Sequence, residues 1–351
     1  IELGGRIQLQ YVNMDPDVGD SSDDLFFRRL RPYIAGTVTA DWDGKIQIDF
    51  GKSAGDNEVA VKDAYMRYTG WDNLSLFIGN TKTPFAREFL ASSKRQQLVE
   101  RSFAGDHNYG APDRQLGLRL DGSTADKKLA YKLSLGAESH DPDVRRLDFD
   151  TPVNESGDWN EGVVVAGRLD YMPMGSMKYD QVDFRSDSLK MGFGLAVFSW
   201  SNDDDNNTYT DANGVALSGS KADLDSATGV EVSVSARGNG FSADVDYQSI
   251  DADTVVSDFT GGVYSNGGTD LEKIAVEGGY LFPNNVELVA AWDTQDADGY
   301  ATPWERTSVG ANYYFNKHKM KAQFTYRMGK NVNGVRGTDE HTGFMQFQFV
   351  F

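Results

Sequence analysis

Apolar and polar residues alternate one by one along many short segments of the chain. In residues 230–236, for example, Val232 and Val234 alternate with the polar Glu231 and Ser233. A β-strand whose two faces meet different surroundings has this period of two. Sixteen segments of this kind begin near residues 4, 26, 44, 59, 73, 114, 128, 161, 188, 228, 240, 271, 286, 305, 319 and 341.

The connections between these segments are alternately short and long. Short connections occupy residues 41–44, 70–73, 121–127, 238–240, 283–285 and 316–318. Long connections occupy residues 12–24, 83–113, 139–160, 202–227, 251–270, 295–304 and 329–340. The connection 172–187 departs from this scheme, because it is longer than its place among the short turns predicts. Tight turns at one end, long loops at the other and an even strand number are typical of a bacterial outer-membrane β-barrel.

Charged residues recur on the polar faces of the predicted strands. They include Lys45, Asp49, Arg119, Lys132, Arg168, Asp170, Asp244, Asp246, Glu287 and Lys321. A soluble β-sandwich would have to bury such rows at a cost in free energy, and so many charges do not fill a dry interior. A water-filled lumen accommodates them. We therefore predict an all-β fold, a closed 16-stranded antiparallel transmembrane barrel that forms one domain over residues 1–351.

The last strand is the clearest example of the alternation. Met345, Phe347, Phe349 and Phe351 fall on one face and are expected to contact lipid, while Gln346 and Gln348 fall on the water-facing side. In a closed barrel this strand pairs with the first one, residues 4–11, since an unpaired edge does not persist in lipid.

Aromatic residues lie near several predicted strand ends, namely Trp42, Trp71, Tyr280, Phe282, Tyr313, Tyr314 and Phe315. We expect them to form the girdles at the two membrane interfaces. The alternative is that they are ordinary core aromatics.

The totals and the motifs argue against an enzyme. The chain has 53 acidic and 34 basic side chains and no cysteine, which excludes a thiol nucleophile and a disulfide framework. No P-loop, GxSxG or HExxH motif occurs, and the four histidines are scattered. The aspartates at 203–205, 251 and 253 do not match a calcium-binding EF-hand loop. We expect no catalytic residues, no cofactor and, for so acidic a chain, no nucleic-acid partner.

A cluster of basic residues opens the second predicted strand. Alternation places Arg29 and Arg31 on the luminal face, because the opposite face is apolar. Arg28 then falls on the lipid side, unless the strand is irregular at that point. A solvated edge that binds lipid headgroups is the alternative reading of this cluster.

A second basic cluster follows the fifth predicted strand. The strand carries Lys82 and should end at Pro84, and the following residues suit about two turns of helix. This connection carries Arg87, Lys94, Arg95 and Arg101, and a strand resumes at Arg114. We predict that the third loop, residues 83–113, folds into the mouth of the barrel and narrows the pore. Basic side chains around a pore favour anions, and arginine donates bidentate hydrogen bonds to phosphate-like oxyanions.

These segments resemble the phosphate-selective porins O and P of Gram-negative bacteria. The matching pieces are Phe27-Arg28-Arg29, Gly36-Thr37, Asp63-Ala64-Tyr65, residues 79–85, Ser92-Ser93-Lys94 and Glu100-Arg101-Ser102. They cover roughly the first third of the chain, in the order of the family. The resemblance implies a homotrimeric outer-membrane porin with an inward-folded third loop and an arginine-lined anion path. It also implies that Arg28, Arg29, Lys82, Lys94 and Arg101 contact anions.

The predicted environment of such a protein is the outer membrane, with its lipid and lipopolysaccharide. A C-terminal strand that ends in Phe351 resembles the signal that outer-membrane barrels present to their assembly machinery. The pore-lining candidates are Arg28, Arg29, Arg31, Lys82, Lys94, Arg95 and Arg101. They favour a porin for small hydrophilic solutes with a preference for anions.

Two other functions stay open at this point. The later strands place Glu231, Asp244, Asp246, Glu277, Glu287 and Asp293 on the luminal face. A general or cation-preferring porin would suit these acids, and a reversal potential in a salt gradient distinguishes it. A barrel with a plugged lumen that acts as a receptor, adhesin or structural protein would show no single-channel conductance. An outer-membrane enzyme would need a catalytic constellation that the sequence does not contain.

Overall fold

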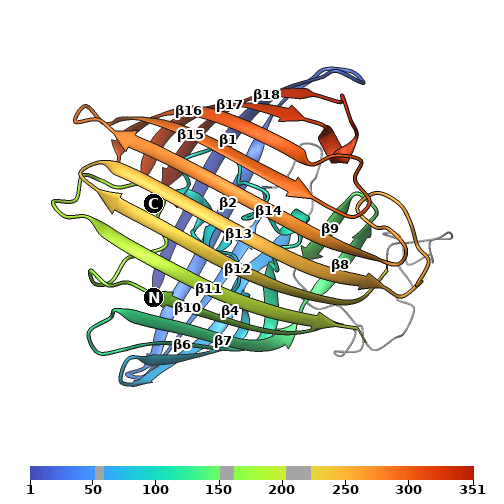
Figure 1. Cartoon of the computed structure of the whole chain (residues 1–351). Helices are drawn as coiled ribbons and strands as arrows, with labels where there is room; N and C mark the ends of the chain where they lie inside the picture. Colours follow the sequence, from blue (N-terminus) through green and yellow to red (C-terminus); the bar gives the residue numbers. More distant parts are fainter. Residues whose placement is uncertain (52–58, 151–161, 203–222) are drawn as a thin grey trace.

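The computed structural model describes residues 1–51, 59–150, 162–202 and 223–351, which form a closed β-barrel (Figure 1). Its wall, within the described residues, consists of sixteen antiparallel strands, in agreement with all sixteen predicted segments. They are β1 (Glu2–Pro16), β2 (Ser22–Thr39), β3 (Trp42–Asp49), β4 (Ala60–Trp71), β5 (Leu74–Lys82), β6 (Arg114–Ser123), β7 (Leu129–Ala137), β10 (Val163–Tyr171), β11 (Lys190–Ser201), β12 (Leu224–Gly238), β13 (Phe241–Thr254), β14 (Gly268–Leu281), β15 (Val286–Asp296), β16 (Trp304–Asn316), β17 (Met320–Lys330) and β18 (Glu340–Val350).

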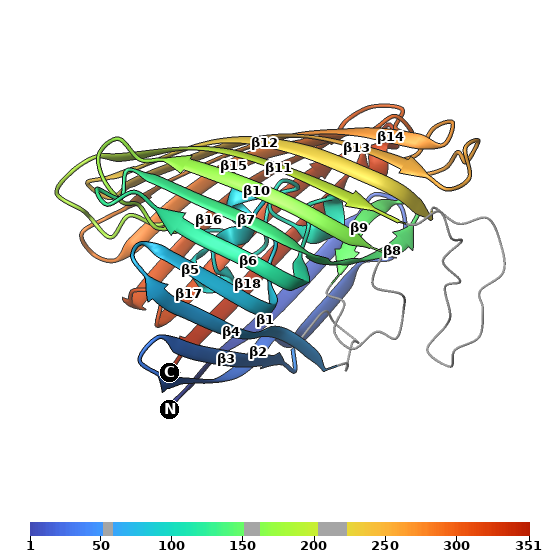
Figure 2. The ribbon, with the colours of Figure 1, turned by 90° about the horizontal axis from the view of Figure 1, so that it is seen from below.

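The first and last strands close the barrel. Ile7 lies opposite Phe349 and Leu9 lies opposite Phe347 in the antiparallel register of β1 and β18. Both chain ends lie at the same end of the barrel (Figure 2). The predicted pairing of residues 4–11 with the C-terminal strand is therefore confirmed, and the wall has no open edge.

The alternation in the sequence becomes the two faces of the wall. On β12, Val230 and Val232 are 43% and 48% exposed on the outer face, whereas Glu231 and Ser233 are buried on the luminal face. An apolar outer band suits lipid, because the backbone polar groups of every strand are bonded to the neighbouring strands. Among the described residues, no helix is long and apolar enough to cross a membrane.

Short turns join the strands at the end that holds the termini. Between β12 and β13, Asn239 and Gly240 have φ angles of 55° and 91°. A two-residue turn with positive φ at both positions matches the twist of a hairpin, and Asn-Gly is its preferred sequence. A Cβ at Gly240 would lie 2.6 Å from the carbonyl oxygen of Leu281, so the position also requires glycine for space.

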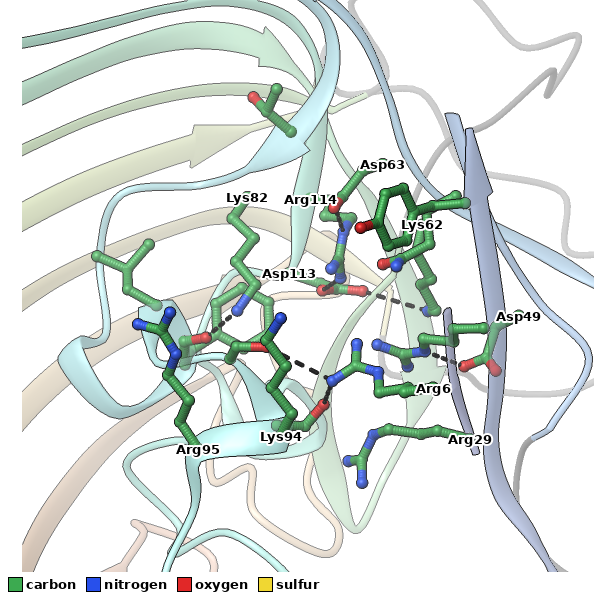
Figure 3. Close-up of a pocket in the computed structure, with 18 of the residues that line it drawn as sticks. Arg6, Arg29, Asp49, Lys62, Asp63, Lys82, Lys94, Arg95, Asp113 and Arg114 are labelled. Carbon is green, nitrogen blue, oxygen red and sulfur yellow. Dashed lines mark hydrogen bonds and ion pairs between the residues drawn. The ribbon is translucent and has the colours of Figure 1, made fainter. Parts of the chain in front are cut away.

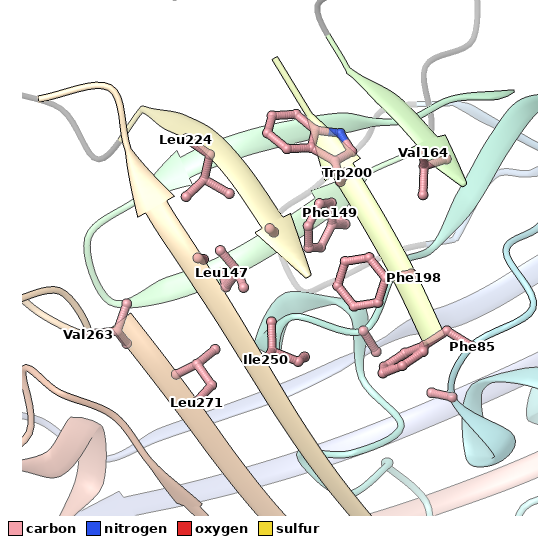
Figure 4. Packing of buried hydrophobic residues seen from close by; sticks show 14 of the residues in the cluster. Phe85, Leu147, Phe149, Val164, Phe198, Trp200, Leu224, Ile250, Val263 and Leu271 are labelled. Atoms are coloured by element: carbon pink, nitrogen blue, oxygen red, sulfur yellow. The ribbon is translucent and has the colours of Figure 1, made fainter. Parts of the chain in front are cut away.

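The outer end of the lumen holds an apolar core that the sequence did not predict. The connection between β7 and β10 forms a hairpin of β8 (Ser139–Asp143) and β9 (Arg146–Asp150), which pairs only with itself. Leu147 and Phe149 of this hairpin pack against luminal residues of β10 to β14 (Figure 4). These wall residues include Val164, Phe198, Trp200, Leu224, Ile250 and Leu271. Apolar side chains therefore fill the lumen on this side, where the inserted hairpin covers the apolar wall.

Most of the aromatic residues near strand ends face outward, as predicted. Trp71, Phe282, Tyr313 and Phe315 are exposed on the outer face. Tyr314 is the exception, since it is 2% exposed and its hydroxyl donates a 2.6 Å hydrogen bond to Oε2 of Glu287 in the lumen. The prediction for Tyr314 was wrong because three consecutive residues of a strand cannot share one face.

Candidate functional site

The third loop leaves β5 after Lys82 and returns to the wall at Arg114. It contains one helical turn, α1 (Arg87–Leu90), and two short 3₁₀ turns, η1 (Ser93–Arg95) and η2 (His107–Tyr109). The two turns of helix predicted from the sequence are therefore reduced to one. The reason is that several backbone N–H groups of the loop bond to side chains elsewhere instead of to helical carbonyls. Arg87 N donates to the carboxylate of Glu231, and Val99 N donates to Oγ1 of Thr325.

Luminal side chains of the wall hold the carbonyl groups of the third loop. Lys321 Nζ donates to Gln96 O at 2.6 Å, and Arg327 Nη2 donates to Glu100 O at 3.1 Å. Further donors are Lys273 to Tyr109 O, Asn312 to Gln97 O, Gln348 to Lys94 O and Gln8 to Ser93 O. Buried carbonyls without partners would be costly, so these bonds fix the loop inside the barrel.

The long connection between β10 and β11 also folds inward, from the end that holds the termini. Asp180 of this connection lies 2.8 Å from Nε2 of His318 and 3.9 Å from Nε of Arg95. Gln181 accepts a 3.1 Å hydrogen bond from the backbone N–H of Gln97. This connection therefore contacts the third loop from the end of the barrel that holds the termini. The inward fold accounts for the unusual length of the connection.

A cavity of about 1280 Å³ lies between the third loop and the wall formed by β1 to β6 (Figure 3). Among the described residues, its lining carries thirteen lysine and arginine side chains but only six aspartate and glutamate side chains. The chain as a whole has a net charge of −19, so the charge balance in this passage is opposite to that of the protein. All seven candidates from the sequence line the cavity, namely Arg28, Arg29, Arg31, Lys82, Lys94, Arg95 and Arg101.

Arg28 reaches the cavity because β2 is irregular. The register of β1 and β2 shifts so that Gln8 lies opposite Arg29 and Leu9 lies opposite Phe27, which leaves Arg28 as the extra residue of a β-bulge. Its Nε lies 2.7 Å from Oε1 of Glu100 in the third loop. The irregularity that the sequence analysis required for a luminal Arg28 is thus present.

The cations of the cavity differ in their partners. Arg28 pairs with Glu100, and Arg31 pairs with Asp49 at 2.5 Å. Six others form no ion pair with a carboxylate of the described residues, namely Arg6, Arg29, Lys82, Lys94, Arg101 and Lys178.

Neutral groups hold several of these cations in place. Arg6 Nη1 donates to Oγ of Ser93 at 2.6 Å, Arg29 Nη1 donates to Oε1 of Gln8 at 3.1 Å, and Lys82 Nζ donates to a loop carbonyl. The Nε of Arg29 is buried and has no hydrogen-bond partner. A cation held by neutral groups keeps its full charge for a passing anion.

Two ionisable groups of the loop strengthen this arrangement. Burial alone would raise the pKa of Glu100, but the charges of Arg28 and Arg29 outweigh it and lower that pKa to about 2. Burial opposes protonation of His107, but the carboxylates of Asp113 and Asp148 outweigh it and raise its pKa to about 9. His107 lines the cavity and is therefore a further cation at neutral pH.

Sequence reasoning missed Arg6, Lys62, Arg114 and Lys178 as cations of the cavity, whereas it assigned Lys45 and Arg119 to the lumen without naming them as anion contacts. Arg6 was detectable, because it has the same parity on β1 as the polar Gln8 and lies opposite Arg31 on β2. Lys178 was not, because its connection gave no sign that it folds inward.

Of the aspartates considered for calcium, 203–205 lie outside the described residues, and Asp251 and Asp253 lie with exposed side chains on β13 instead of in a loop.

A closed barrel with an apolar outer face and a cation-lined cavity beside an inserted loop is an outer-membrane porin. The chain belongs to the family of phosphate-selective porins O and P, whose family model matches residues 1–230. This is a family of channels. The resemblance found in the first third of the chain is thereby confirmed, and the match extends to residue 230.

Solved porins share the fold. The trimer form of OmpT from Vibrio cholerae is 13% identical, with a TM-score of 0.60 over 99% of this chain and 99% of that chain. OmpF of Salmonella typhi, in complex with daunomycin, is 14% identical, with a TM-score of 0.63 over 99% of this chain and 97% of that one. An anion-selective porin from Comamonas acidovorans is 10% identical, with a TM-score of 0.59 over 100% and 99% of the two chains. No curated protein matches the sequence.

Proposed function

We propose that this porin lets small hydrophilic solutes diffuse passively across the outer membrane with a preference for anions, phosphate-like oxyanions included. The observation that carries the proposal is the set of six cations without ion-pair partners in the described cavity, in a chain that is acidic overall. Cations that line a passage raise the local concentration of anions and lower the electrostatic barrier to their passage.

Two clusters carry the proposed selectivity. Arg6 and Arg29 project from β1 and β2 on one side of the cavity, and Lys94 and Arg95 project from the third loop on the other side (Figure 3). Arginine donates paired hydrogen bonds that suit an oxyanion, whereas lysine acts as a point charge. A permeating anion would exchange part of its hydration for these donors and leave again, because no single site encloses it.

We also propose a homotrimer in the outer membrane, in contact with lipid and lipopolysaccharide. The support is the family and the trimeric form of the OmpT structure. Phe351, exposed at the end of the last strand, is proposed to be read by the barrel assembly machinery.

A barrel with a closed lumen that acts as a receptor, adhesin or structural protein is the second candidate. The observation in its favour is that the third loop, the hairpin of β8 and β9, and the connection between β10 and β11 all occupy the lumen. The cation-lined cavity of about 1280 Å³ on the side of β1 to β6 supports the porin over this candidate.

Single-channel recording in planar bilayers tests the proposal. We expect stable conductance in potassium chloride and a partial block of the chloride current when phosphate is added, because the two anions compete for the same cations. Absence of conductance from folded protein would favour the closed barrel. Conductance with no response to phosphate would leave a general porin without an oxyanion preference.

A further inference from the structure

One side of the lumen is acidic and the other is basic, and the third loop lies against the acidic side. The acidic wall consists of Glu231 on β12, Asp244 and Asp246 on β13, Glu277 on β14, and Glu287 and Asp293 on β15. None of these six residues lines the large cavity of the described structure. The alternation of side chains along each strand points all six residues into the barrel. They are therefore covered by the loop and its neighbours and not by the water of the cavity.

Contacts with the third loop account for part of this cover. Glu231 is fully buried and accepts hydrogen bonds from the backbone N–H of Arg87 at 2.9 and 3.1 Å. Glu287 is fully buried and accepts a 2.7 Å hydrogen bond from Nε2 of Gln97. The guanidinium of Arg87 lies 3.2 Å from Asp244. The loop thus supplies donors and one positive charge to three acids of the wall.

Arginines of the wall also pair with two of these acids, Glu231 and Asp244, and with Asp293. Arg168 Nη1 lies 2.7 Å from Glu231, Arg237 Nη2 lies 2.5 Å from Asp244, and Arg306 Nη2 lies 2.9 Å from Asp293. Asp246 and Glu277 differ, since neither forms an ion pair within the described residues and each has one oxygen without a hydrogen-bond partner. Both line a cavity of about 20 Å³ that Glu88, Leu98 and Ser102 of the loop help to enclose.

Apart from His107, which is a cation at neutral pH, the charges of the loop cancel. Residues 83–113 contain four basic residues, Arg87, Lys94, Arg95 and Arg101, and four acidic residues, Glu88, Glu100, Asp106 and Asp113. Its effect on selectivity therefore depends on which groups it exposes and which it covers, not on the sum of its charges.

We infer that the third loop determines ion selectivity by covering the acidic wall of β12 to β15, so that permeating ions meet mainly the basic wall of β1 to β6. The inference rests on the proposed anion preference and extends it to a specific device. A carboxylate that is paired and shielded from water by packed protein contributes little to the field in the passage, whereas the same carboxylate in contact with the pore water attracts cations.

The first test leaves the loop intact and compares two double variants in bilayer reversal-potential measurements. Asp246→Asn with Glu277→Gln removes two acids that the loop covers. Asp63→Asn with Glu100→Gln removes two acids that line the passage. We expect the first pair to leave the anion-to-cation permeability ratio close to that of the unaltered channel and the second pair to raise it several-fold. Equal shifts from the two pairs would overturn the inference.

The second test removes the cover. Replacing residues 88–106 by a short glycine-serine linker deletes three acidic and three basic residues, so the net charge is unchanged. We expect this channel to lose its anion preference, and we expect Asp246→Asn with Glu277→Gln to restore part of it in this background only. Retained anion preference in the shortened channel, or an effect of the amide pair that is the same in both backgrounds, would contradict the inference.

The two tests separate this inference from the proposed function. A cation preference in the unaltered channel would refute the proposed function, while the unequal effect of the two amide pairs would still measure the cover. Heat-modified mobility on gels establishes that each variant is folded. If the shortened channel does not assemble, the comparison of the two amide pairs decides the question alone.

Discussion

Gln8 on β1 donates a 2.7 Å hydrogen bond from Nε2 to Oε1 of Gln348 on β18, across the seam where the two ends of the chain pair. Both side chains are 0% exposed. Gln348 also donates to Lys94 O at 3.0 Å and to His318 O at 2.5 Å. The seam of the barrel is therefore bonded directly to the third loop. Gln348 was expected at a water-facing position from the alternation of the last strand, and that expectation was wrong because the loop covers it.

The contacts of Gln348 predict that Gln348→Ala loosens the loop without opening the barrel. The substitution leaves the carbonyl of Lys94 and the amide of Gln8 without this partner, and each unsatisfied buried group costs about 1–3 kcal/mol. We expect normal assembly, a lower thermal unfolding temperature and larger current fluctuations. Gln10→Ala is the matched control. Gln10 is a buried luminal glutamine of β1 that donates to Glu100 of the third loop but forms no side-chain hydrogen bond with β18. Identical current noise in the two variants would contradict a special role for the seam.

Phe351 combines a backbone role with an exposed ring, and two variants separate them. Phe351 exchanges backbone hydrogen bonds of 3.0 and 3.1 Å with Gly5, so its deletion shortens the seam, whereas Phe351→Leu keeps those bonds. In refolding into lipid vesicles we expect the deletion to lower the folded fraction and Phe351→Leu to leave it nearly unchanged. In cells we expect both variants to assemble poorly, since the assembly machinery is proposed to read the ring. Equal assembly of the leucine variant and the unaltered chain in cells would refute that reading.

Arg29 is predicted to contribute directly to anion preference, because it has no ion-pair partner among the described residues and lines the cavity. Removing one unit charge about 4 Å from a permeating ion changes its energy by about 1 kcal/mol in water, which is a few-fold change in permeability. We expect Arg29→Gln to lower the anion-to-cation permeability ratio by that amount. Arg67→Gln also removes one positive charge, but Arg67 pairs with Asp43 outside the cavity. Equal effects of the two variants would show that Arg29 does not line the path.

Glu88 predicts a pH dependence of the attachment of the third loop. Burial raises the pKa of Glu88 to about 7, above the ordinary value of about 4.5, although hydrogen bonds from Ser102 and the charge of Arg101 act in the opposite direction. The attached loop therefore holds this proton more tightly than a detached loop does. Attachment is unaffected by this group below about pH 4.5 and weakens as the pH rises from there to about 7.

The measurement is the thermal transition of the folded barrel and its current noise between pH 5 and pH 8. We expect a lower transition temperature and more noise at the higher pH. The free energy of loop attachment should fall by at most about 1.4 kcal/mol per unit of pKa shift. Glu88→Gln cannot ionise and should flatten the profile. A profile that is unchanged by Glu88→Gln would assign the pH dependence to other groups.

The wall of the barrel was predictable because it depends on a local rule. Alternation alone placed Arg29 and Arg31 in the lumen and Phe347 and Phe349 on the lipid face, and it found the partner of the last strand. Arg28 needed a β-bulge, which the sequence could only raise as a condition.

The contents of the lumen were not predictable, because they depend on contacts between segments far apart in the chain. Glu231 and Lys321 looked like water-facing residues, but both are fully buried under the third loop. The hairpin that carries Phe149 was expected to be an outer loop, and the sequence did not show that it enters the lumen. No local pattern reveals which backbone groups of a loop will bond to which wall side chains.

The measurement that tests the central claim most directly is the reversal potential of the unaltered channel in a tenfold gradient of potassium chloride. In the proposed mechanism, permeating ions meet the basic wall of β1 to β6, and most acidic residues of the chain lie elsewhere. It predicts a potential of the sign that chloride selectivity produces, and a smaller value at high ionic strength because salt screens the charges. A potential of the opposite sign, which means selectivity for potassium, would contradict it.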